Sequence, residues 1–168
     1  MKIEDLSIRA RIGFAGYILD SFFMKIENHF EAKNIIINKI WEIPEGNDIE
    51  SWLEEFVELL PDVIFEEAYN HEDPYVFLTN NQFNCIKFLY EDCEEHILQI
   101  IKLIFEIVNI HVYGKIVDNG KESLEELKKI FDFAKKASIN LKIEENNLFS
   151  IKNENGWGKT FSKNILVP

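Results

Sequence analysis

Hydrophobic residues recur every three or four positions along most of the chain, which is the spacing of one face of an α-helix. Between residues 5 and 30 they form one continuous stripe: Ile8, Ile12, Ala15, Leu19, Phe22, Ile26 and Phe30. This stripe predicts a single first helix over residues 5–30, with Asp5 as its N-cap. Gly13 and Gly16 lie inside it, and we expect them to let a neighbouring helix approach closely.

Further stripes predict three helices in the next part of the chain. A short helix is expected over residues 34–42. Asp48 is the predicted N-cap of the following helix, which ends or kinks at Pro61 because proline lacks an amide donor and its ring clashes with the preceding turn. Another short helix is expected over residues 62–70. The inward positions of the helix after Asp48 are Ile49, Trp52, Leu53, Phe56 and Leu60.

The most apolar part of the chain predicts a long central helix over residues 80–113. Thr79 and Gln82 have the spacing of a capping box, in which both side chains satisfy free backbone amides at a helix start. From Ile97 onward only a narrow polar stripe reaches water, so we expect this helix to be the most buried of the bundle. The stripe consists of Gln99, Lys102, Glu106 and Asn109.

A last helix is predicted to start at a second capping box, formed by Ser123 and Glu126. The helical pattern then stops, and Asn155-Gly156 is a hairpin signal. Only 7 Gly and 4 Pro, with 46% hydrophobic residues, also favour long helices over many short strands. The sequence therefore predicts a mainly all-α fold with a long central helix: a helical bundle over residues 1–138, and an extended or hairpin tail over 139–168.

Acidic residues are concentrated in one window of the chain. Between Ile40 and Ile101 there are 16 Asp or Glu residues and a single basic side chain, Lys87, although the whole chain carries a net charge of −12. Such a field repels nucleic acid and anionic membrane and attracts basic proteins or cations. The only basic cluster is Lys128, Lys129, Lys135 and Lys136, which we interpret as the solvated face of the last helix.

Candidate catalytic and metal-binding patterns are sparse. A di-iron helical bundle needs Glu-x-x-His motifs, and the residues three before the four histidines are Ile26, Ala68, Cys93 and Val108. No glycine-flanked serine elbow and no phosphate-binding glycine loop occurs. We therefore expect no cofactor, no metal and no catalytic residues. Cys85 and Cys93 are interpreted as reduced core thiols, which suits the cytoplasm.

Neither a secretory signal nor a membrane-spanning run is found. The first five residues, Met1 to Asp5, lack the basic and apolar regions of a signal peptide. The polar stripe beyond Ile97 interrupts the most apolar segment every three or four positions. We expect a cytoplasmic protein.

Several segments together suggest a family. A first helix containing Leu19–Phe23 is followed by Ile40-Trp41-Glu42-Ile43-Pro44-Glu45-Gly46, which reads as a helix ending in a Trp-Glu-x-x-x-Gly turn. An acidic amphipathic helix over residues 48–58 and an apolar helix ending in Val112-Tyr113-Gly114 come next. Over roughly its first 115 residues the chain resembles the all-helical immunity proteins of bacterial polymorphic toxin systems. The resemblance implies a protein that binds and neutralises a cognate toxin domain and has no catalytic residues of its own.

The leading hypothesis is a cytoplasmic immunity protein that binds a basic toxin domain through an acidic surface. The predicted partner-binding residues are Glu54, Glu55, Glu58, Asp62, Glu66 and Glu67, with Trp52 and Tyr69 as aromatic edges. One rival is an enzyme with a pocket between helices, perhaps metal-dependent, that uses Glu67, His71, Asp92 and His96. Another is a helical adaptor or self-associating module.

Overall fold

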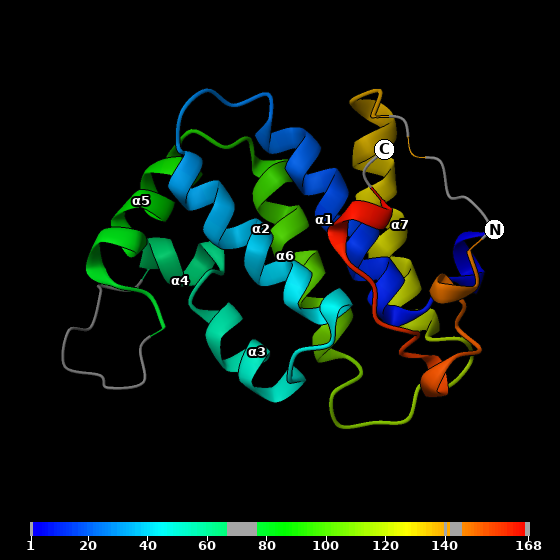
Figure 1. Cartoon of the computed structure of the whole chain (residues 1–168). Helices are drawn as coiled ribbons and strands as arrows, with labels where there is room; N and C mark the ends of the chain where they lie inside the picture. Colours follow the sequence, from blue (N-terminus) through cyan, green and yellow to red (C-terminus); the bar gives the residue numbers. More distant parts are fainter. Residues whose placement is uncertain (1, 67–76, 140, 142–145, 167–168) are drawn as a thin grey trace.

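The computed structural model describes residues 2–66, 77–139, 141 and 146–166. Over these residues the chain forms α-helices and no strand, which confirms the mainly all-α prediction (Figure 1). The helices are α1 (Ile8–Phe23), α2 (Phe30–Glu45), α3 (Ile49–Val57), α4 (Pro61–Glu66), α5 (Asn80–Glu91), α6 (Glu95–Asn109) and α7 (Lys121–Lys136). None of the described helices is both long enough and apolar enough to cross a bilayer.

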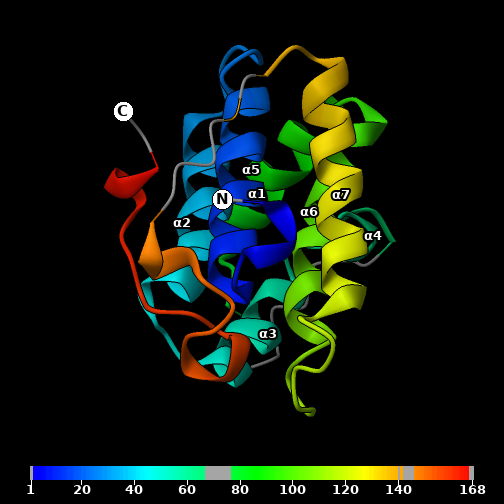
Figure 2. The same cartoon turned by 90° about the vertical axis from the view of Figure 1, so that its right-hand side faces the viewer.

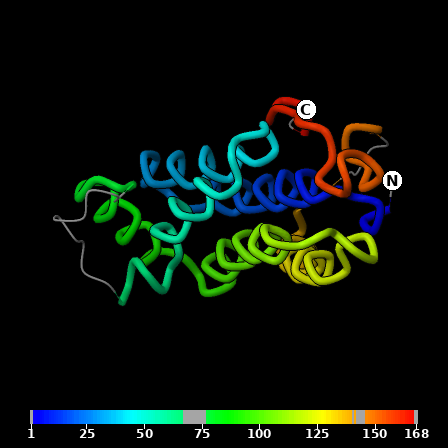
Figure 3. Tube along the Cα trace, turned by 90° about the horizontal axis from the view of Figure 1, so that it is seen from below, coloured from blue at the N-terminus to red at the C-terminus, as the bar shows by residue number. Residues whose placement is uncertain are grey.

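Helix α1 is the centre of the bundle. It lies between α2 on one side and the α6–α7 pair on the other (Figure 3). The tail covers a further side, because the amide of Ser7 donates to Phe149 and that of Arg9 donates to Trp157. Twelve of the 16 residues of α1 are consequently buried, against seven of 15 in α6. We expected the helix after Ile97 to be the most buried of the bundle, and this was wrong, because a larger fraction of α1 is buried.

The prediction of one helix over residues 5–30 was also wrong. Helix α1 begins after Ser7, whose hydroxyl caps it by accepting from the amide of Ala10, and it ends at Phe23. Asn28 and His29 have φ of 62° and 58°, so the chain turns through two left-handed residues before α2 starts at Phe30. This turn allows α2 to fold back along α1. The close approach expected at Gly16 is confirmed, since a Cβ there would lie 2.9 Å from Cγ2 of Ile40.

The predicted long helix over residues 80–113 is two helices. Its capping box is confirmed, with both reciprocal hydrogen bonds of Thr79 and Gln82 formed. The polar run from Glu91 to Glu95 interrupts it, and Glu94 is extended (φ −69°, ψ 148°). The break redirects the chain, so α5 packs on α2 while α6 packs on α1. Ile101 and Ile104 are fully buried in α6, as their place in the apolar run predicts.

The starts of α4 and α7 also differ from the prediction. Pro61 is the first residue of α4, where a missing amide costs nothing, rather than the end of the preceding helix, which stops at Val57. Helix α7 begins at Lys121 after Gly120, which is left-handed (φ 62°). Ser123 is not a cap but a fully buried residue of α7.

The tail follows the outside of the bundle rather than forming a hairpin (Figure 2). Among its described residues only an isolated antiparallel bridge joins Ser150 to Leu6. Residues 154–156, at the predicted hairpin turn, form a 3-10 turn instead. The rings of Phe149 and Phe161 meet at 5.0 Å, and Phe161 lies edge-on to Trp41 at 6.1 Å. These contacts fix the tail against α1 and α2.

Candidate functional site

Nine of the 16 acids of the window lie on the last turn of α2, on α3 and its two flanking residues, and on α4, whereas Glu91, Asp92, Glu94 and Glu95 lie at the break between α5 and α6. We call the region of these nine carboxylates the acidic surface and define it by them: Glu42, Glu45, Asp48, Glu50, Glu54, Glu55, Glu58, Asp62 and Glu66. Asp48 is the N-cap of α3, as predicted: its side chain accepts from the amide of Ser51, and this hydrogen bond lowers the pKa of the carboxyl. The other eight divide into acids with partners inside the protein and acids without.

Two of the carboxylates neutralise a buried lysine. The side chain of Lys39 is only 3% exposed, and its Nζ lies 2.8 Å from Glu42 and in contact with the carboxylate of Glu55. The ring of Phe77 covers the same ammonium at 4.5 Å. A buried ammonium is stable only when paired and hydrogen-bonded. The ion pair of Glu55 with Lys39 therefore links α3 to α2.

Glu58 also has partners inside the protein, but they are backbone amides. Its two carboxylate oxygens accept from the backbone amides of Phe77 (2.6 Å) and Leu78 (2.9 Å). These residues lie just before the capping box of α5, so Glu58 anchors the entry to that helix on the end of α3. Of the predicted site residues, Glu55 and Glu58 therefore have structural roles.

Asp62 has a partner that enters from α6. Lys102 donates to its Oδ1 at 2.5 Å, and both side chains remain substantially exposed. An exposed pair of this kind contributes about 0–1 kcal/mol to stability. Asp62 is accordingly still accessible, but a docking partner would have to displace or share Lys102.

Glu45, Glu50, Glu54 and Glu66 are exposed and form no ion pair with any residue that the structure describes. Glu50 and Glu54 are four apart on α3 and share one face of it. Exposed apolar side chains lie nearby: Val57 of α3 is 39% exposed, Phe65 of α4 is 43% exposed, and Phe77, before α5 and bound to Glu58 through its amide, is 38% exposed. The surface therefore offers free negative charge together with accessible apolar groups.

One of the two predicted aromatic edges, Trp52, is buried rather than on this surface. Trp52 is 1% exposed, its Nε1 donates to the carbonyl of Lys39 at 2.6 Å, and its ring stacks on Phe56 at 4.3 Å. Its inward position in the apolar stripe explains this burial, and its assignment as a partner-binding residue was wrong. Glu67 and Tyr69 lie outside the described residues, as does His71.

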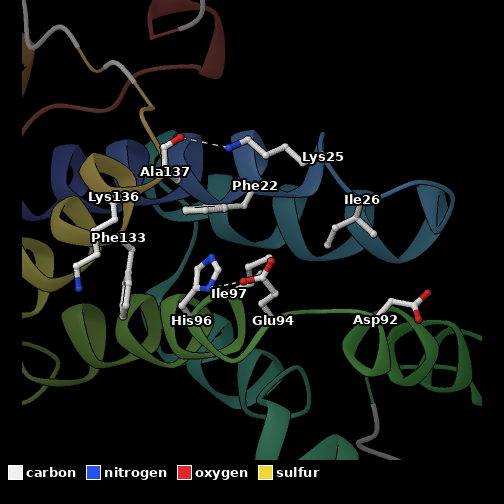
Figure 4. A pocket seen from close by; sticks show the side chains of 10 residues that line it. All are labelled: Phe22, Lys25, Ile26, Asp92, Glu94, His96, Ile97, Phe133, Lys136 and Ala137. Carbon is white, nitrogen blue, oxygen red and sulfur yellow. Dashed lines mark hydrogen bonds and ion pairs between the residues drawn. The ribbon is translucent and has the colours of Figure 1, made fainter.

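The remaining residues of the enzyme hypothesis, Asp92 and His96, do not share a helix face. Asp92 lies before the break that precedes α6 and contacts Nε2 of His29 at 2.7 Å. Nδ1 of His96 lies 3.3 Å from Glu94. Both nevertheless line one pocket at the end of the bundle (Figure 4). No group of three or more potential metal ligands occurs in the described part of the chain.

A serine–histidine pair that the sequence analysis missed lies between α6 and α7. Nε2 of His111 is 2.7 Å from the hydroxyl of Ser123, which also receives Nη1 of Arg11 at 2.7 Å and donates to the carbonyl of Gly120. Ser123 is completely buried, and these partners occupy its donor and both acceptor sites. The pair resembles an activated nucleophile but is a closed structural network.

The two cysteines remain thiols. Cys85 and Cys93 are unpaired and half-buried. Burial raises the pKa of Cys93 to about 12, so its reactive thiolate form is negligible at neutral pH. No protein-family model, no curated protein and no solved structure matches this chain, so the acidic surface and the pocket carry the functional argument.

Proposed function

We propose that this protein is a cytoplasmic immunity protein that binds a basic toxin domain through its acidic surface. The observation that carries the proposal is a set of exposed carboxylates that form no ion pair with a described residue: Glu45, Glu50, Glu54 and Glu66. The resemblance of the first 115 residues to helical immunity proteins supports the same role.

The charge distribution suits rapid capture of a basic partner. Only Lys39 and Lys102 contact the nine acids among the described residues, and Lys39 is buried. A surface of one sign accelerates encounter with an oppositely charged protein and disfavours partners of like charge. The exposed side chains of Val57 and Phe77 add apolar area of the kind found at the centre of interfaces.

Of the four residues of the enzyme hypothesis the structure describes two, Asp92 and His96, and it does not pair them with each other. Asp92 and His96 each have a different close partner, and Ser123 is sealed from solvent. The binding role needs no such constellation. It requires only an accessible surface whose charged groups are free to engage a partner.

A growth-rescue experiment tests the proposal. The open reading frame next to the gene for this chain is expressed alone and together with the chain, and growth is measured. We expect growth arrest in the first case and rescue in the second. The E50K/E54K variant should lose most of the rescue, because both carboxylates are exposed on one face of α3 and form no ion pair with a described residue.

The matched control is E4K/D132K, which exchanges the same number of exposed carboxylates outside the acidic surface. It should rescue as well as the parent. Circular dichroism and thermal melting verify that both variants fold. A neighbouring product that is not toxic, or equal rescue by the two variants, contradicts the proposal.

A further inference from the structure

A second candidate site lies at the end of the bundle away from the acidic surface. Figure 4 shows a pocket between the end of α1, the turn before α6 and the last turn of α7. Its volume is about 510 Å³, within the roughly 300–1,000 Å³ of small-molecule sites. It is lined by Phe22, Lys25, Ile26, Asp92, Glu94, His96, Ile97, Phe133, Lys136 and Ala137.

Three rings form one wall of the pocket. The His96 ring lies between Phe22, at a centroid distance of 4.9 Å, and Phe133, at 5.8 Å. Phe22 is 4% exposed and belongs to the buried core, so it supports the wall from behind while His96 and Phe133 are more accessible. Flat aromatic surfaces favour a ligand that presents a ring of its own, which stacks or meets them edge-on.

Around the pocket the two acids have partners of opposite or potential opposite charge within the protein, whereas the two lysines have none among the described residues. Both acids have a histidine partner, His29 for Asp92 and His96 for Glu94. Among the described residues, Lys25 contacts the carbonyl of Ala137, at 3.4 Å, and the ring of Phe22. Among the same residues, Lys136 contacts the ring of Phe133. In the described chain neither ammonium has a carboxylate partner, although the protein as a whole carries a charge of −12.

The ring of His96 contributes to the wall but offers no donor to an anion. Its Nδ1 faces Glu94, and its Nε2 has no hydrogen-bond partner among the described residues. Nε2 of His96 does not contribute to anion binding, because Nδ1 faces the Glu94 carboxylate and Nε2 is then the acceptor of the neutral ring. Two ammonium groups without a carboxylate partner in the described chain therefore border an aromatic wall. This combination recognises a negative charge attached to an apolar ring.

We infer that this pocket binds a small aromatic anion. The ring of the ligand lies against Phe22, His96 and Phe133, and its anionic group is held by Lys25 and Lys136. The inference does not depend on the proposed toxin binding, because it uses none of the residues of the acidic surface. Failure of one test leaves the other standing.

The probe is indole-3-acetate, titrated into the full ¹⁵N-labelled chain and followed by NMR. We expect saturable shifts at the amides of residues 94–97 and 133–137. Indole-3-acetamide has the same ring and no charge, and should bind about tenfold more weakly, the usual effect of losing a charge-assisted hydrogen bond.

The adjacent lysines of α7 supply a matched pair of variants. K136M removes the ammonium that lines the pocket and should weaken indole-3-acetate about tenfold. K135M removes an exposed ammonium one residue away that does not line it, and should bind like the parent. No saturable shifts at millimolar probe, equal affinity for the acid and the amide, or equal loss in both variants overturns the inference.

Discussion

The two arginines of the chain, both on α1, donate hydrogen bonds to segments that are distant in sequence. Arg11 is completely buried and donates to the carbonyls of Leu6 (2.9 Å), Asn119 (2.6 Å) and Gly120 (2.6 Å), and to Ser123. It thus joins the start of α1 to the segment before α7. Burial lowers the pKa of Arg11 to about 10, which still leaves it charged at neutral pH. The planar guanidinium spans several acceptors that a single ammonium cannot reach together.

We expect R11K to lower the free energy of unfolding by about 3 kcal/mol or more, since it leaves several buried carbonyls without a donor at about 1–3 kcal/mol each. Urea denaturation measures the change. The comparison variant is R9K. The side chain of Arg9 is 14% exposed, so water can replace part of its hydrogen bonds, and the loss of stability in R9K should be smaller. Equal losses at the two positions would show that Arg11 has no special role.

His111 makes stability depend on pH. Burial, and then the charge of Arg11, lower the pKa of His111 below its ordinary value of about 6.5. Above that value the residue is neutral in both the folded and the unfolded chain and contributes no pH dependence. As pH falls below it, the unfolded chain takes up the proton first, so the folded state loses stability.

We therefore expect the free energy of unfolding to fall more between pH 7 and pH 5 for the parent than for H111Q. The glutamine amide can still donate to Ser123 but does not titrate. Urea titrations at several pH values measure both slopes. Identical slopes would mean that His111 does not titrate differently on folding.

At the scale of elements, Gly16 sets the separation of α1 and α2. Helix propensity alone predicts that G16A stabilises the protein by about 1 kcal/mol. The added Cβ would lie 2.9 Å from Ile40, however, and overpacking of a core costs about 1–3 kcal/mol. We expect a lower melting temperature for G16A and no comparable loss for G114A, where a Cβ meets nothing within 4 Å. A stabilised G16A would contradict this account.

The acids of α3 differ in what they support. E55K would place a second ammonium beside buried Lys39, and E58K would remove the acceptors of two backbone amides. We expect E55K/E58K to lose about 2 kcal/mol or more of stability, less than the roughly 3–5 kcal/mol of a fully buried pair because Glu55 stays partly exposed. E50K/E54K should melt close to the parent. Equal melting of the two double variants would refute the structural role.

The helix signals that were predicted correctly are local ones. Asp48 and Thr79 cap their helices through hydrogen bonds to residues three positions away, which the sequence displays directly. Ser123 has the same signature but bonds instead to His111 and Arg11, which only the fold brings near. Helix breaks were missed because the apolar stripe continues across the left-handed turn at His29 while the buried faces change neighbours.

The candidate site, like the helices, could be predicted only where its signal is local in the sequence. The sequence predicted an acidic helix with an outward face, and Glu54 and Glu66 are indeed exposed. It could not show that Lys39 and Lys102, just outside the acidic window, pair with its carboxylates. The one local clue was Lys39 itself, a charge beside Ile40 and Ile36 on the buried side of α2.

At the scale of the whole molecule, charge and packing are separated in space. The apolar core and both buried cations centre on α1 and α2, while the free carboxylates extend from the last turn of α2 across α3 and α4. The pocket lies elsewhere, where α1 and α7 end. The acidic surface and the pocket therefore lie at different places on the bundle and differ in chemistry.

The most direct test of the central claim is the association rate between this protein and the product of the neighbouring reading frame, the proposed toxin, as a function of ionic strength. Raising salt from 0.1 M to 1 M shortens the Debye length from about 10 Å to about 3 Å. The parent should therefore associate about tenfold or more slowly at high salt, whereas folded E50K/E54K should be slow throughout and nearly insensitive to salt. An unchanged rate and salt dependence in that variant would contradict docking on the acidic surface.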